Sequence, residues 1–199
     1  MQDFISHFSA KPAFTVDEAR IFLHNRRASN GYYRLVIHNL LKSGRIFRIT
    51  KGAYTFHNEA QFVGFAFNPF YYGLEDALSL HGLWEQETNP VIITPRDVRT
   101  GIRQFEGRNF LIRHIDRSMF FGYSYQQYGD FYIPVSTVEK TLIDFAYFKI
   151  KLRKDVIEKI IERIDLEFLR DLLGEIPTPL KLKVKKILHR SMSSIDLNL

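Results

Sequence analysis

The residues best suited to a chemical role are cations gathered in one stretch near the N-terminus. From residue 19 to residue 58 the chain carries eight Lys or Arg and no Asp or Glu. Residues 1–59 hold nine Lys or Arg against four acids, which is +5 of the total net charge of +6. Because cations without nearby carboxylates attract phosphates, this stretch predicts a contact with a polyanion. The alternative is an ordinary core surrounded by solvated Lys and Arg.

Few residues are arranged for catalysis. The chain has no Cys, which excludes disulfides, thiolate metal sites and Cys nucleophiles. Its seven His are scattered, and neither a Gly-rich phosphate loop nor a nucleophile-elbow pattern occurs. A metal-dependent nuclease needs converging carboxylates beside a cation, for which Asp97, Glu106 and Arg108 are candidates, although exposed loop charges explain them better. We therefore expect a protein that is not an enzyme and has no cofactor and no metal site.

The N-terminal stretch has the pattern of helices followed by a hairpin. Residues 1–10 predict a first helix, and the capping-box spacing of Thr15 and Glu18 predicts the start of a second. A third helix is predicted from about residue 30 to residue 42, with an apolar stripe of Tyr33, Val36, Ile37, Leu40 and Leu41. Gly44 follows as a helix stop, and two β-rich runs flank a turn at Lys51-Gly52.

This order of elements predicts a winged helix-turn-helix over residues 1–59. The third helix fits the major groove of DNA, where Arg34, His38 and Asn39 would read base edges and Asn30 would lie at the helix start. Cations before the helix and on the hairpin would hold phosphates, namely Arg26, Arg27, Arg45, Arg48 and Lys51.

The exposed face of the predicted third helix carries further residues. Tyr32 and Lys42 complete the predicted DNA-binding set. Leu35 also lies on this face, where it would touch a thymine methyl group, pack under the hairpin, or indicate that the helix is rotated. Winged helices also bind proteins, and a protein-binding or purely structural module is the second interpretation.

Residues 60–199 predict a second domain of mixed α+β structure, so the fold class is α+β. A helix is expected from Leu74 to His81, ended by Gly82, and strands are expected within residues 90–95, 109–115, 119–125 and 129–134. Ser136 and Glu139 have capping-box spacing and predict another helix start. From about residue 153 to residue 191 the pattern is helical.

Three signatures occur in an order that resembles a known family. They are the N-terminal segment ending in LLKSGRIFRITKGAYTF, the segment YYGLEDALSLHGLWEQ followed by VIITP, and the segment VSTVEKTLIDFAYF. Over roughly residues 5–150 the chain resembles the AbiEi-type antitoxins, which are winged-helix transcriptional regulators. The resemblance implies a repressor that binds double-stranded DNA at its own promoter. It also implies a neighbouring nucleotidyltransferase-like toxin, which the antitoxin opposes without a stable complex.

The resemblance also marks positions in the second domain, namely Ser79, His81, Thr137, Glu139, Lys140 and Asp144. The same residues have a structural interpretation. Glu139 has the spacing of a helix cap, and Lys140 with Asp144 has the i, i+4 spacing of a helical ion pair.

Other features of the sequence bear on the cellular location of the protein and on its alternative functions. No apolar run approaches 18 residues and no signal-peptide pattern occurs, so we expect a cytoplasmic protein without a membrane segment. The last predicted helix carries Lys181, Lys183, Lys185, Lys186 and Arg190, which predict either a solvated basic face or a contact with nucleic acid, an acidic partner or a membrane surface. A stand-alone repressor, whose second domain binds a ligand or dimerises, is the alternative function, and the sequence does not determine the oligomeric state.

Overall fold

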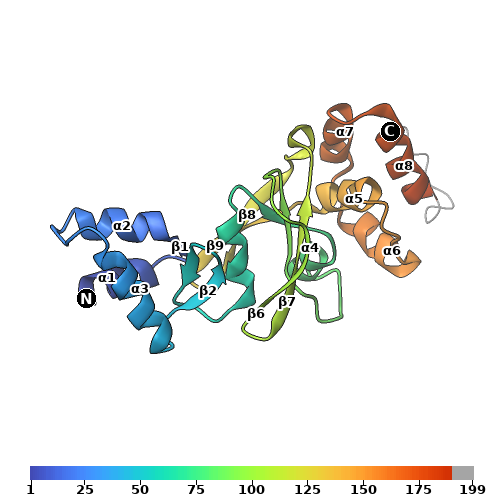
Figure 1. Cartoon of the computed structure of the whole chain (residues 1–199). Coiled ribbons are helices and arrows are strands. Elements are labelled where there is room, and N and C mark those ends of the chain that lie inside the picture. Colours follow the sequence, from blue (N-terminus) through green and yellow to red (C-terminus); the bar gives the residue numbers. More distant parts are fainter. Residues whose placement is uncertain (190–199) are drawn as a thin grey trace.

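The computed structural model describes residues 1–189 of the chain. Its N-terminal part holds three helices, α1 (Gln2–Ser9), α2 (Val16–His24) and α3 (Tyr32–Lys42). A small antiparallel sheet accompanies them, formed by β1 (Phe14–Thr15), β2 (Phe47–Thr50) and β3 (Ala53–Thr55), with β3 in the middle. Figure 1 shows these helices at one end of the molecule and the C-terminal helices at the other.

Aromatic rings form the core of the N-terminal part. Phe4 and Phe8 of α1 pack with Phe14 of β1 and Phe22 of α2, with ring centroids 4.6–6.0 Å apart. Side chains of α3 complete this cluster with Val36, Ile37 and Leu40. The predicted first helix is confirmed and buries Phe4 and Phe8, and α3 buries Val36, Ile37 and Leu40 of its predicted apolar stripe.

Short sequence patterns correctly predict the start of α2 and the β2–β3 hairpin, and they predict the start of α3 to within two residues. The predicted capping box is confirmed, because the Thr15 hydroxyl accepts from the Glu18 amide and the Glu18 carboxylate accepts from the Thr15 amide. Helix α3 begins at Tyr32 rather than Asn30, since its N-cap is Gly31 with φ of +95°. The predicted hairpin is β2 and β3, joined at Lys51-Gly52 with Gly52 at φ +84°.

The centre of the molecule is a six-stranded mixed sheet in the order β6-β7-β5-β4-β9-β8. Its strands are β4 (Tyr71–Tyr72), β5 (Val91–Thr94), β6 (Gly101–Phe105), β7 (Arg108–His114), β8 (Tyr123–Tyr128) and β9 (Phe131–Ser136). The predicted strands at β5, β7 and β9 are confirmed. The run predicted over residues 119–125 is wrong in its first half, because Met119 ends a short 3-10 helix, η2 (Arg117–Met119), and β8 begins only at Tyr123.

Both faces of the central strands are apolar and buried. Tyr71 pairs with Ile93 and Tyr72 with Ile92 across β4 and β5. Because successive side chains alternate between the faces of a sheet, Tyr71 and Ile93 belong to one core cluster and Tyr72 and Ile92 to another. The first cluster is covered by C-terminal helices and the second by η1 (Ala60–Phe67), a 3-10 helix that also contacts all three N-terminal strands.

The helices α4 (Leu74–Leu80), α5 (Val138–Tyr147), α6 (Lys154–Arg163), α7 (Leu166–Gly174) and α8 (Thr178–His189) complete the fold. The capping box predicted for Ser136 and Glu139 is wrong. Ser136 remains the last residue of β9, and the helix begins one residue later than expected, with Thr137 as N-cap accepting from the Lys140 amide.

The C-terminal part is helical, as predicted, through His189. Helix α8 packs against the core through Leu180, Val184 and Leu188, and its basic side chains lie on the remaining surface. The predicted end at residue 191 and the predicted cation Arg190 lie outside the described residues. Within residues 1–189 no helix is long and apolar enough to cross a lipid bilayer.

A buried carboxyl group joins α4 to the covering segment η1. Asp76 is 3% exposed, and its carboxylate accepts hydrogen bonds of 3.1 Å from the Gln61 side chain and from the Val91 amide. Burial raises the pKa of Asp76 to about 7, from an ordinary value of 3.8, because desolvation outweighs the two hydrogen bonds and the charge is taken out of water. The folded protein therefore binds this proton more tightly than the unfolded chain.

The pKa of Asp76 makes stability depend on pH. Since the folded pKa lies above the unfolded one, this group stabilises the fold fully below about pH 4, and its contribution is lost as the pH rises through 7. The shift corresponds to at most about 4 kcal/mol. Urea unfolding between pH 4.5 and 8 should show this loss, and Asp76→Asn should remove much of it. The exposed Asp171→Asn serves as control, and equal pH profiles for all three proteins would contradict the assignment.

Candidate nucleic-acid interface

A groove of about 610 Å³ lies between α3 and the β2–β3 hairpin. Its floor is apolar, with Ile37, Leu41 and Tyr54 among the lining residues. Its polar rim comes from two elements, since α3 supplies Arg34 and His38 and the hairpin supplies Arg48 and Lys51. Among residues 1–189, no carboxylate lines the groove. A ligand that reaches α3 here therefore meets positive charge and hydrogen-bond donors on both sides.

Aromatic rings hold several of the exposed guanidinium groups. Arg34 donates from Nε to the Tyr33 hydroxyl at 3.1 Å. Arg48 lies 5.9 Å from the centre of the Tyr54 ring, and Arg26 lies 3.7 Å from that of Phe22. Because each ring is anchored in the N-terminal core, these contacts limit the conformations of the arginine side chains and lower the entropy lost on binding.

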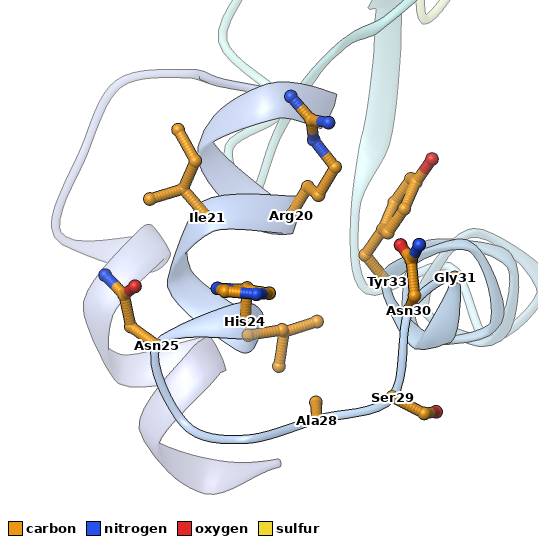
Figure 2. A pocket seen from close by; sticks show the side chains of 10 residues that line it. Arg20, Ile21, His24, Asn25, Ala28, Ser29, Asn30, Gly31 and Tyr33 are labelled. Carbon is orange, nitrogen blue, oxygen red and sulfur yellow. The ribbon is translucent and has the colours of Figure 1, made fainter.

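A second hollow, of about 520 Å³, lies at the turn between α2 and α3. Figure 2 shows Arg20 and His24 on α2, Ala28 and Ser29 on the turn at its edge, and Tyr33 facing α2 from α3. Arg20 pairs with Asp17 at 3.1 Å on the surface of α2. This hollow lies beside the N-terminal end of α3, where the helix dipole favours an anion.

Every residue predicted to bind DNA is exposed: Arg26, Arg27, Asn30, Tyr32, Arg34, His38, Asn39, Lys42, Arg45, Arg48 and Lys51. None of the ion pairs found within residues 1–189 involves any of these side chains. Within residues 1–189 these cations are therefore not neutralised by carboxylates, so association with a polyanion does not first require one of the ion pairs found there to break.

The predicted set does not form a single cluster. Arg48 and Lys51 line the groove, whereas Arg26 and Arg27 lie in the turn before α3. Arg45 lies past the C-terminal end of α3. Leu35 is 53% exposed and does not line the groove, so it does not pack under the hairpin. The buried stripe of α3 shows that the helix has the predicted rotation.

The motif residues of α5 form a buried polar network. The predicted ion pair between Lys140 and Asp144 is confirmed, but both side chains are completely buried. The Tyr71 hydroxyl donates to Asp144 and accepts from Lys140, each at 3.0 Å. Burial raises the pKa of Asp144 and lowers the pKa of Lys140, because desolvation outweighs the opposing attraction between the two charges. This geometry fixes α5 on β4.

The other motif residues hold elements together. Glu139 does not cap α5 but accepts the Asp165 amide at 2.8 Å, which joins α5 to the start of α7. His81 Nε2 lies 2.7 Å from the Ser136 carbonyl, next to the capping residue Thr137. Ser79 is half-buried and lies one residue before the end of α4. His81, Thr137, Lys140 and Asp144 thus lie around the α4–α5 contact, and Glu139 faces α7.

The three residues considered for a metal-dependent nuclease, Asp97, Glu106 and Arg108, do not lie at one end of a strand. Asp97 lies in the loop before β6, whereas Glu106 and Arg108 lie at its other end, about 15 Å away by the rise of a five-residue strand. In the part of the chain that the structure describes, no group of three His, Asp or Glu is placed to hold a metal ion.

Sequence reasoning missed three arginines, Arg96, Arg99 and Arg103, which lie across a cleft from Lys51. The sequence shows that these three arginines fall within eight positions. It does not show that they lie near Lys51, because 45 positions separate Lys51 from Arg96. Reasoning from the sequence also missed Tyr71 and Tyr72, whose hydroxyl groups join the polar networks on the two faces of the sheet.

The buried pair predicts a strong asymmetry between single and double substitution. Asp144→Asn leaves the Lys140 ammonium group without its counter-charge and should lower the free energy of unfolding by about 3–5 kcal/mol. Lys140→Met combined with Asp144→Leu should recover much of this loss. Glu158→Gln breaks the exposed i, i+4 pair with Lys154 and is the matched control. Urea unfolding measures all four proteins, and a single variant as stable as the control would contradict a stabilising pair.

Comparison with known proteins adds no family to this geometry. No protein-family model matches the chain, and no curated protein matches it. The chemistry of the interface therefore rests on its own residues, which are exposed cations and hydrogen-bonding side chains on one helix and one hairpin.

Proposed function

We propose that residues 1–59 form a winged helix-turn-helix that binds double-stranded DNA, with α3 in the major groove and the β2–β3 hairpin as the wing. The observation that carries this proposal is the groove between the two elements. It is lined by Arg34, His38, Arg48 and Lys51 and, in the part of the chain that the structure describes, by no carboxylate. The order of helices and strands also supports it, because a helix-turn-helix followed by a hairpin is the winged form of this DNA-binding motif.

The dimensions of α3 suit the major groove. Eleven residues give a helix about 16 Å long, and the major groove is about 12 Å wide, so roughly two exposed turns meet base edges. Arg34, His38 and Asn39 lie in these turns, and an Arg guanidinium or an Asn amide makes paired hydrogen bonds to a purine edge. We assign base reading to these three side chains.

The remaining exposed cations surround the reading face. Arg26 and Arg27 precede α3, Arg45 follows it, and Arg48 with Lys51 lies on the hairpin. Phosphates flank the major groove on both sides, so cations at both ends of a recognition helix contact the backbone and fix its register. Asn30, Tyr32 and Lys42 border the same face and are assigned to backbone contacts.

The second part of the chain is proposed to carry a regulatory role of the AbiEi antitoxin type. This rests on the resemblance of its motifs, by which the protein represses its own operon and opposes a nucleotidyltransferase-like toxin. The buried positions of Glu139, Lys140 and Asp144 support a structural task for these motif residues, because they hold α5 against β4 and α7. A surface of this part, not the buried network, would then meet any partner.

Two other functions predict different observations. A stand-alone repressor, with a ligand-binding or dimerising second part, would have no toxin gene beside its own. A nuclease would cleave DNA and require Mg²⁺, whereas the proposed repressor binds DNA in the presence of a chelator. Gel analysis of labelled DNA with Mg²⁺ and with EDTA separates the nuclease from both repressors.

Substitutions in α3 and in the hairpin should have different effects on DNA binding. Arg34→Ala should remove about 1–3 kcal/mol of preference for DNA from upstream of the gene over scrambled DNA, because a base contact is lost. Arg48→Ala should weaken both DNAs alike and lower the slope of log K against log salt by about 1, because a phosphate contact is lost. Fluorescence anisotropy across a salt series measures both effects.

The control for this experiment is Arg163→Ala, which removes an exposed cation from α6, far from α3 (Figure 1). It should bind both DNAs like the unmodified protein. Absence of binding to either DNA at moderate salt would overturn the DNA-binding proposal and favour a protein-binding or structural role for residues 1–59.

A further inference from the structure

A cleft of about 490 Å³ lies between the hairpin turn and the loop that joins β5 to β6. Its walls come from the start of α2, the turn around Gly52, the end of η1 and strand β6. Four cations line it, which are Lys51, Arg96, Arg99 and Arg103. The single carboxylate among the lining residues is Asp17, and it is paired with Arg20. The cleft therefore carries a clear excess of positive charge.

Backbone carbonyls and a ring orient two of these arginines. Arg96 donates to the Ala66 and Asn68 carbonyls at 3.5 and 3.4 Å. Arg103 donates to the Arg99 carbonyl at 2.6 Å and lies 5.4 Å from the centre of the Phe67 ring. Across residues 1–189 none of the ion pairs involves Arg96, Arg99 or Arg103. Guanidinium groups that are oriented but not neutralised are suited to phosphate oxygens.

The cleft is joined to the groove on α3 by the hairpin turn. Lys51 and Gly52 line both hollows, so the turn is their common wall. The hairpin is also fixed against the central sheet. Ile49 of β2 is buried in the cluster that includes η1, and the rings of Phe47 and Phe105 lie 6.3 Å apart. The hairpin turn that carries Lys51 is therefore held by a shared core against β6, the strand that carries Arg103.

We infer that this cleft is a phosphate-binding site, with Arg99 and Arg103 as its principal ligands and Lys51 as the cation shared with the groove. Two sources supply such a phosphate. One is the backbone of DNA that extends past the bases read by α3, and this source rests on the proposed function. The other is a free phosphorylated small molecule bound beside the hairpin. The ligand chemistry is the same, and experiment distinguishes the sources.

The DNA arm compares two duplexes taken from DNA upstream of the gene. Both are centred on the segment that the bound protein protects from nuclease digestion. One has about 12 base pairs and covers roughly one helical turn, and the other has about 30 base pairs. The variant is Arg99→Ala, chosen because its side chain makes no hydrogen bond or ion pair within residues 1–189. On the long duplex it should lower the salt slope by about 1, and on the short duplex it should leave the slope unchanged.

The small-molecule arm uses inorganic pyrophosphate and isothermal titration calorimetry on the full chain. Arg99→Ala should weaken pyrophosphate binding at least about tenfold if a free phosphate is the ligand, because a charge-assisted contact is lost. Arg117→Ala, which removes an exposed arginine from η2, is the matched control in both arms. Arg34→Ala should weaken DNA binding but leave pyrophosphate binding unchanged.

The outcomes separate this inference from the proposed function. A length-dependent loss of salt slope assigns the cleft to flanking DNA, and an Arg99-dependent loss of pyrophosphate affinity assigns it to a free phosphate. If no duplex binds, the DNA-binding proposal fails, yet Arg99-dependent pyrophosphate binding still supports the site. If Arg99→Ala behaves like Arg117→Ala in both arms, the phosphate site is overturned, whether or not α3 binds DNA.

Discussion

The constraint on which the rest of the structure depends is that the central strands are apolar on both faces. Tyr71 and Tyr72 are adjacent in β4, both are fully buried, and they point to opposite sides of the sheet. A sheet of this kind must be covered twice, because each exposed apolar face costs free energy in proportion to its area. The helices after residue 138 cover one face, and η1 with strand β2 covers the other.

Each cover is also attached by one tyrosine hydroxyl. On the helical side, the Tyr71 hydroxyl joins the Lys140–Asp144 pair. On the other side, the Tyr72 hydroxyl donates to the Gln61 carbonyl and accepts from the Gly64 amide. Because a buried polar group is costly without a partner, these bonds specify how each cover sits on the sheet, while apolar contact supplies most of the stabilisation. The buried motif residues of α5 thus act in folding.

The second cover links the fold to the candidate interface. Ile49 belongs to the hairpin and is buried under the sheet together with η1, so the wing of the proposed winged helix is part of the same core as the central strands. This places the hairpin turn between two basic hollows, one facing α3 and one facing Arg96, Arg99 and Arg103. Positive charge then continues from the N-terminal helices onto the second part of the chain, beyond the stretch free of acids.

By itself the sequence determined the features that depend on near neighbours. The Thr15 capping box, the stripe of α3, the glycine stop at Gly44 and the hairpin at Gly52 follow from residues a few positions apart. The exposure of Arg34 and Lys42 follows from the stripe that they oppose on α3. Strands β5, β7 and β9 were predictable from β-branched and aromatic runs. The DNA-binding and antitoxin roles stay predictions.

Only the tertiary structure decided what depends on distant partners. Strand β4 has two residues and β6 has weak alternation, so neither shows as a strand until its neighbours pair with it. The N-cap of α5 is Thr137 rather than the predicted Ser136, because Ser136 pairs with Tyr123 as the last residue of β9. The burial of Lys140 and the position of Arg99 near Lys51 arise from packing between segments far apart in the chain, and local spacing carries no information about such contacts.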